Sequence, residues 1–137
     1  LHVRMARHCE NGQAVAEFLA SHPKIAYVNY CGLPGDKYHA VAEKYLPNGS
    51  CGVVSFGVKG GREAAAAFMG HLKIAAIETH VADARTCCLH PASSTHRQMN
   101  DEQLIAAGVQ PDLVRMSCGL EDKNDLIHDI AQALDQI

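Results

Sequence analysis

The sequence has no long hydrophobic run, no cluster of basic residues, and no segment in which a charged start is followed by an apolar stretch. A transmembrane helix needs about 20 consecutive apolar residues, so the first absence argues against a membrane span. The third absence argues against a signal peptide. Because the formal net charge is −3 over 137 residues, we expect neither nucleic acid nor a membrane as a partner.

The glycine-rich patterns that bind nucleotides and dinucleotides are also missing, since neither G-x-x-x-x-G-K-[ST] nor G-x-G-x-x-G occurs. The nearest segment is VKGGREAA (58–65), which places Lys59 and two glycines before a predicted helix. A helix N-terminus attracts anions. We favour the simpler interpretation, in which Gly60 and Gly61 turn a strand into a helix.

The residues that are present are typical of one folded domain, with 47% hydrophobic and 20% charged residues. The chain begins at Leu1, and the first segment already has helical spacing, so we expect a piece of a longer protein. The six cysteines are scattered among predicted helices and strands rather than arranged as a secreted disulfide framework. We therefore expect a reducing cytoplasm, with most cysteines acting as small buried hydrophobes.

Hydrophobic periodicity predicts helices and short strands in alternation. A predicted helix after Asp36, its expected N-cap, has an apolar face, and another begins at Asn100, with Gln103 placed for a capping box. The last predicted helix, after Glu121, has one apolar stripe, made of Leu126, Ile127, Ile130, Leu134 and Ile137. Short strands are predicted at 24–30, 51–59, 74–80, around 86–88 and at 113–119. The fold class is therefore α/β (α+β two-layer), with a small mixed or antiparallel sheet of about five strands covered by helices. The strand order stays open.

The run CCLHPASSTH, from Cys87 to His96, gathers cysteines, histidines and hydroxyl residues. Neighbouring strand residues point to opposite faces, so Cys87 and Cys88 are poorly placed to bind one zinc ion. A cysteine nucleophile with a histidine base cannot be identified from sequence neighbours alone. We favour a hydroxyl-rich turn fixed by Pro91, with its side chains bonded to the backbone. A zinc or redox role for Cys87, Cys88 and His90 stays open.

Arg115 lies in the middle of an apolar strand, LVRMSC. It alternates with Val114 and Met116, so it shares a strand face with Leu113 and Ser117. A guanidinium among apolar residues is costly unless it is paired, and its planar fork matches a carboxylate. Two interpretations remain: an internal ion pair with an Asp or Glu, or a receptor for the carboxylate of a small molecule.

Three blocks of sequence carry a resemblance to a known family: YCGLPGDKYHAVAEKYLPNGSCGVVSFGVKGGREAAAAFM, HPASSTH and LIAAGVQPDLVRMSCGLEDKNDLIHDI. They resemble, in order and over nearly the whole chain, the C-terminal part of the pyridoxal-phosphate-dependent enzymes of cysteine and methionine metabolism. Within that family they are most similar to the O-acetylhomoserine sulfhydrylases. The chain departs from the usual pattern at Cys31, where family members have proline, and at Cys87 and Cys88, which replace more aliphatic residues.

The resemblance implies a large cofactor domain followed by a smaller domain, in a tetramer built from catalytic dimers. We accordingly expect residues 1–22 to form a linking helix and residues 23–137 the C-terminal, substrate-contacting domain. The family's cofactor-binding lysine lies in a Ser-x-Thr-Lys-like segment, and no lysine here has that context. We therefore expect pyridoxal 5′-phosphate in the full-length enzyme, with none bound to this chain. We expect this chain to contain no catalytic, cofactor-binding or metal-binding residue, and to be inactive alone.

The resemblance also implies which residues bind the substrate. The arginine that grips the substrate α-carboxylate in the family's R-L-S-x-G-x-E block matches Arg115, in agreement with the argument from the strand. A serine four positions before the histidine of the HP block matches Thr86, and the main chain of Cys87 lies beside it. The implied reaction is a γ-replacement, in which sulfide displaces acetate from O-acetylhomoserine to give homocysteine.

Other functions remain open at this point. The resemblance also allows the sister reactions of cystathionine γ-synthase and methionine γ-lyase, because their specificity residues lie mostly outside this chain. A different class of function is a free-standing amino-acid-binding or oligomerisation module with no enzyme attached.

Overall fold

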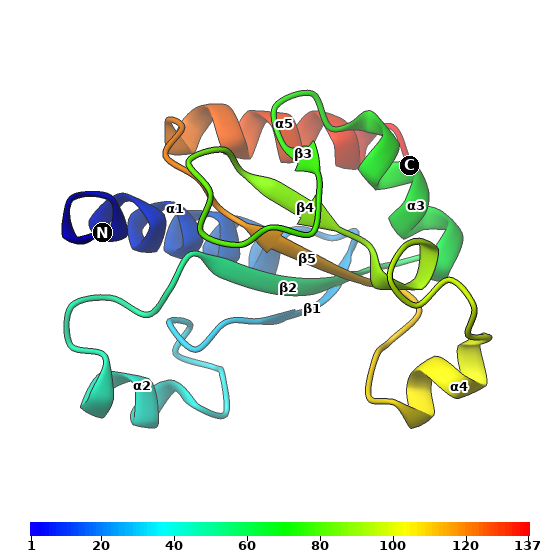
Figure 1. The fold of residues 1–137 in the computed structure, drawn as a ribbon, viewed down its shortest axis with the longest axis horizontal. Helices are drawn as coiled ribbons and strands as arrows, with labels where there is room; N and C mark the ends of the chain where they lie inside the picture. The colour runs from blue at the N-terminus through cyan, green and yellow to red at the C-terminus, as the bar shows by residue number, and fades with distance from the viewer.

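Alternating apolar residues build a central sheet in the computed structural model, which describes residues 1–137 (Figure 1). In β2 (Val53–Val58), for example, Val54, Phe56 and Val58 are fully buried. The other strands are β1 (Ile25–Asn29), β3 (Ala76–Ile77), β4 (Cys87–Leu89) and β5 (Leu113–Ser117). The strand order is β1-β2-β5-β4-β3, antiparallel except for the parallel pair β3–β4. The predicted α/β fold with a small mixed sheet is confirmed.

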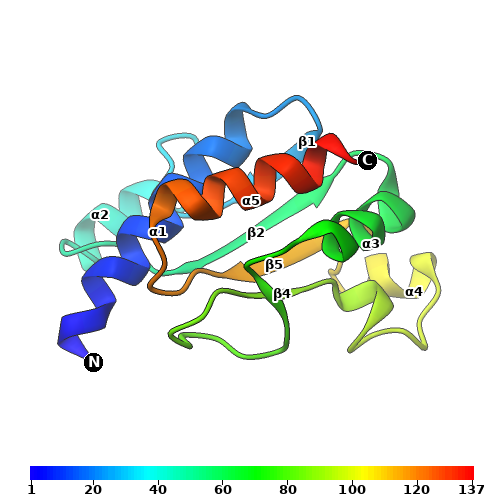
Figure 2. The same ribbon diagram turned by 90° about the horizontal axis from the view of Figure 1, so that it is seen from above.

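Three helices cover one face of this sheet: α1 (His2–Ser21), α3 (Gly61–His71) and α5 (Lys123–Asp135). Figure 2 looks onto this helical layer from above. The short helices α2 (His39–Tyr45) and α4 (Asp101–Ala106) lie on the other side, toward opposite ends of the sheet (Figure 1). The middle of the second sheet face is therefore left without a helix.

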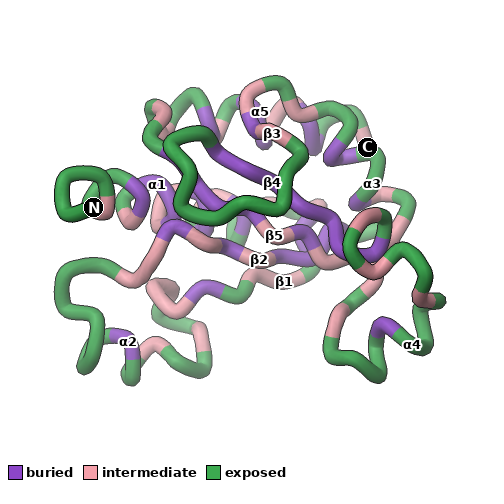
Figure 3. The backbone as a smooth tube through the Cα atoms, in the orientation of Figure 1, coloured by how far each residue is buried: buried purple, intermediate pink, exposed green.

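The core lies between the sheet and the three helices, where Figure 3 shows the buried segments. The predicted apolar stripe of α5 is confirmed at Leu126, Ile130 and Leu134, each at most 1% exposed. Phe56 of β2 meets Phe68 of α3 edge to face, with ring centroids 5.8 Å apart. Burying a side chain of this size contributes about 1.5–3 kcal/mol, so these contacts fix the helical layer on the sheet.

The glycines that follow β2 form the predicted turn. Gly60 and Gly61 have φ angles of 107° and 74°, a left-handed backbone that favours glycine. The Lys59 amine does not face a phosphate-sized cradle, because it donates to the Pro23 carbonyl at 2.7 Å. The strand-to-helix interpretation of this segment is confirmed.

Two local predictions were wrong. The strand expected at 74–80 contains only Ala76 and Ile77, because β3 is an edge strand and its one partner, β4, is itself three residues long. Asp36 does not cap α2, which begins at His39 with Tyr38 as its N-cap. The Asp36 carboxylate instead accepts from the Tyr38 and Tyr30 amides, at 2.8 and 3.2 Å, and closes the turn after β1.

The apolar face predicted for α2 exists in the helix but does not enter the core. Only Ala42 is buried, and the other members of the face are exposed: Tyr38, Val41, Tyr45 and Leu46. Because α2 lies outside the helical layer, no element of the chain covers that face.

The predicted division at residue 22 stays a prediction. Helix α1 packs on β1, β2 and α5 and contributes Val15, Ala16 and Leu19 to the core. The described helices include none with the length and apolar character that crossing a membrane requires.

Candidate functional site

A row of side chains crosses the sheet face that carries no helix. In the strand register, Asn29 of β1 lies opposite Ser55 of β2, Ser55 opposite Arg115 of β5, and Arg115 opposite Leu89 of β4. Residues paired in this way share one face of a sheet. The fully buried Val114 and Met116 point into the core instead. The predicted strand face of Arg115 is confirmed.

A cleft of about 520 Å³ lies over this row. Its polar lining comes from two strands and two loops: Ser55, Thr79, Thr95, His96 and Arg115. A larger hollow of about 640 Å³ lies between α1 and α2, but its lining contains Glu10 and Glu43 and neither Lys nor Arg. Of these two spaces, only the Arg115 cleft therefore offers a cation to an anionic ligand.

The Arg115 guanidinium is held at one corner and otherwise free of partners. Its Nη2 donates to the Thr79 carbonyl at 2.7 Å, while the buried Nε has no hydrogen-bond partner. None of the ion pairs in the chain involves Arg115. The internal ion pair considered from the sequence is therefore not formed. An arginine has five N–H donors in a planar fork, and most of them remain available to an anion.

Thr86 lies next to this face but is fully buried, and its polar atoms are bonded inside the chain. Its hydroxyl donates to the Glu121 carboxylate at 2.8 Å and accepts from the Gly119 amide at 2.8 Å. Its own amide donates to the second Glu121 oxygen at 2.6 Å. Thr86 is not among the residues that line the cleft, so its direct contact with a substrate stays a prediction.

Cys87 and Cys88 point to opposite sides of the sheet, as the strand alternation predicted. Cys88 belongs to the core, and burial raises its pKa. Cys87 is buried on the other face, where its thiol donates weakly to the Arg85 carbonyl at 3.4 Å, and burial raises its pKa as well. Thiols with raised pKa are poor nucleophiles. No three His, Cys, Asp or Glu side chains of the chain are grouped to hold a metal ion.

The HPASSTH segment forms a hydrogen-bonded turn at the edge of the cleft, as favoured from the sequence. Pro91 begins the 3₁₀ turn η1 (Pro91–Ser93), and the Ser94 hydroxyl donates to the His90 carbonyl at 2.6 Å. His90 is 1% exposed, and its Nε2 donates to the Pro111 carbonyl at 2.9 Å. In a neutral imidazole, Nδ1 then accepts from the Ser93 hydroxyl, 2.9 Å away.

Glu121 and Thr79 were not predicted as site residues from the sequence. Glu121 is the last residue of the segment that matches the R-L-S-x-G-x-E block, so its position gave a signal. The pattern did not predict that its partner would be Thr86. Thr79 acts through its main-chain carbonyl, and any residue type supplies that group. No side-chain signal for Thr79 therefore exists in the sequence.

The model of the family described as Cys/Met metabolism PLP-dependent enzyme matches residues 1–135. This chain belongs to that family. The homocysteine synthase of Schizosaccharomyces pombe is 44% identical over 98% of the chain and 32% of its own length. The O-acetyl-L-homoserine sulfhydrylase of Leptospira meyeri is 45% identical over 100% of the chain and 31% of its own length.

A solved structure of another family member has the same fold. It is a putative O-acetylhomoserine (thiol)-lyase from Campylobacter jejuni, with a TM-score of 0.89 and 37% identity over 98% of this chain and 32% of its own. An L-methionine gamma-lyase of Fusobacterium nucleatum also matches, at 41% identity over 98% of the chain and 34% of its own length. The chain thus spans about a third of the length of the family members it matches.

Proposed function

We propose that the chain is the C-terminal, carboxylate-binding part of an enzyme that replaces the acetate of O-acetylhomoserine by sulfide. The observation that carries this proposal is the Arg115 fork, which lies in a cleft without an acidic partner. The names of the relatives from Schizosaccharomyces pombe and Leptospira meyeri support the choice of reaction. In the whole enzyme, residues 1–22 would link this part to the rest of a homotetramer.

The residues of the cleft fit a substrate carboxylate and do not fit the covalent attachment of pyridoxal phosphate. That cofactor is held through a lysine amine, and no lysine lines the cleft. Lys24 and Lys59 direct their amines to backbone carbonyls elsewhere. We therefore place the cofactor's lysine and phosphate donors in the part of the enzyme outside this chain.

Arg115 acts by orientation. A bidentate pair with the α-carboxylate fixes both the position and the plane of the amino acid. The Thr79 carbonyl holds one edge of the guanidinium, so its outer N–H groups face the cleft. Fixing the geometry of the reactants in this way lowers a reaction barrier by several kcal/mol, up to about 10 kcal/mol in the best cases.

A second candidate is elimination from methionine, which the Fusobacterium nucleatum relative favours. Both reactions place an amino-acid carboxylate on the same arginine, so the cleft does not separate them. Assays of the full-length enzyme with O-acetylhomoserine plus sulfide, and with methionine alone, would separate the two. A free-standing amino-acid-binding module would be inactive in both assays.

The test of the proposal is Arg115→Lys in the full-length enzyme. Lysine keeps the charge but loses the fork, so we expect kcat/KM for O-acetylhomoserine to fall by about a hundredfold or more. The cofactor's absorbance should remain. The matched control is Arg97→Lys, at an exposed arginine on the loop beside the cleft with no side-chain hydrogen bond. Retained activity, or a loss of cofactor in Arg115→Lys, would show that the carboxylate role is wrong.

A further inference from the structure

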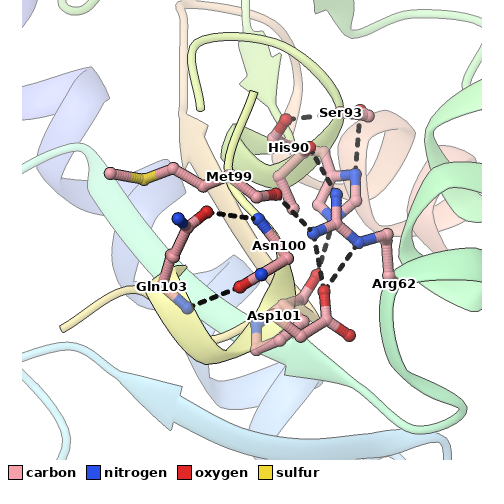
Figure 4. A network of polar contacts seen from close by, with 9 residues as sticks. Arg62, His90, Ser93, Met99, Asn100, Asp101 and Gln103 are labelled. Atoms are coloured by element: carbon pink, nitrogen blue, oxygen red, sulfur yellow. Dashed lines mark hydrogen bonds and ion pairs between the residues drawn. The ribbon is translucent and has the colours of Figure 1, made fainter. Parts of the chain in front are cut away.

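One arginine of the helical layer ties both ends of the loop that forms a wall of the Arg115 cleft (Figure 4). Arg62, the second residue of α3, donates through Nη1 to the Ala92 carbonyl at 2.6 Å and through Nη2 to the Met99 carbonyl at 3.3 Å. Its Nε and Nη2 both donate to Oδ1 of Asp101, the first residue of α4, at 2.9 and 2.6 Å. One side chain therefore joins three points of the chain.

The segment between these ties lines the site. Thr95 and His96 lie between Ala92 and Met99 and face the same cleft as Arg115. The Thr95 hydroxyl and His96 Nδ1 are 2.9 Å apart, so these two side chains pair with each other. Other backbone bonds here, from the His96 amide to the Pro91 carbonyl and from the Met99 amide to the His96 carbonyl, stay within the loop.

The charges at this junction indicate that Arg62 stabilises the 92–99 loop rather than helix α3, to which it belongs. A cation in the first turn of a helix opposes the helix dipole, whereas an anion there is favourable. Arg62 lies in the first turn of α3, and Asp101 lies in the first turn of α4. The unfavourable position of Arg62 is offset by the bonds that it makes across to the loop and to α4.

We propose that Arg62 is a positioning residue, which sets the distance of the 92–99 loop from Arg115 and thereby the fit of the cleft to a substrate carboxylate. This inference rests on the proposed function. The role depends on the four hydrogen bonds that the planar guanidinium of Arg62 donates. Lysine cannot reproduce that geometry.

The experiment compares Arg62→Gln and Arg62→Lys with Arg97→Gln in the full-length enzyme. Without its ties the loop fits the substrate less well, and a loss of about 1.4 kcal/mol in substrate binding is a tenfold change in affinity. We expect Arg62→Gln to raise KM for O-acetylhomoserine about tenfold, with kcat changed much less. Arg62→Lys should give an intermediate KM, because it keeps the charge and one or two of the bonds. Arg97→Gln should match the parent enzyme.

The carboxamide of the same substrate separates a positioning role from a structural one. The carboxamide carries no negative charge with which Arg115 could pair. Arg62→Gln should therefore raise the KM for the carboxamide less than it raises the KM for the acid. A lower melting temperature with an unchanged KM for the acid would overturn the positioning role. If Arg115→Lys is still severely impaired in that case, the proposed function stands without it. If Arg115→Lys is also unimpaired, both proposals fail.

Discussion

At the scale of single residues, Arg115 and Thr86 were predicted as two halves of one site, and the structure gives them different surroundings. Arg115 keeps most of its donors free in a cleft. Thr86 is fully buried and joins the start of β4 to the segment after β5 through Glu121 and Gly119. The methyl group of Thr86 therefore lies in the closed interior of the chain.

Thr86→Val should therefore destabilise the fold as a first effect. The change leaves the Gly119 amide and one Glu121 oxygen without their partner in a buried place, which costs about 1–3 kcal/mol. Urea unfolding measures this loss, and Thr86→Ser should recover most of it because the hydroxyl returns. Thr95→Val, at an exposed hydroxyl, is the control and should change the free energy of unfolding by less than about 0.5 kcal/mol. A fully stable Thr86→Val protein would contradict the structural role.

At the scale of elements, α2 shows that a helix can have an amphipathic pattern without burying its apolar face. Its apolar spacing is as regular as that of α5, yet only Ala42 is buried, at 7% exposure. A stripe of apolar residues predicts which face of a helix would pack, but not whether a partner is present. The stripe of α5 has partners in α1 and α3, and it joins the core that lies over the sheet.

Tyr45→Lys should accordingly leave the stability of the chain nearly unchanged, within about 0.5 kcal/mol, because 66% of Tyr45 is already exposed. Ala42→Lys should cost clearly more, since it puts a long charged side chain at the one buried position of this face. Urea unfolding of both variants measures the difference. Equal losses from the two changes would mean that the outer face of α2 is covered after all.

For the whole molecule, local sequence patterns predicted those structural features that are set by residues close together in the sequence. The capping box of Asn100 and Gln103, the α5 stripe and the face of Arg115 are all short-range features, and each was confirmed. Side-chain pairs between distant segments leave no such trace. Thr86 and Glu121 are 35 residues apart, and Arg62 and Asp101 are 39 apart. Many polar residues could have paired with each of them, and only the folded backbone selects one.

The buried thiols make the stability of the whole fold depend on pH. Burial raises the pKa of Cys118 from 9.0 to about 12, with the Glu121 carboxylate adding to the effect, and burial raises the pKa of Cys88 as well. Both thiols therefore stay protonated in the folded chain above pH 9.0, where the unfolded chain releases their protons. The unfolded state then binds fewer protons than the folded state, so stability falls as the pH rises.

We expect the contribution of these two thiols to the free energy of unfolding to be fully present below pH 9.0, the unshifted thiol pKa. Above that pH the free energy of unfolding should decrease. Each buried thiol contributes a slope of up to about 1.4 kcal/mol per pH unit. Urea unfolding across this range measures the slope, and the double variant Cys88→Ala with Cys118→Ala should make it shallower even if its stability at neutral pH is lower. Cys31→Ala, which removes a half-buried thiol outside the core, is the control. An equal slope in the parent and the double variant would mean that these two thiols are not closed off from water in the folded chain.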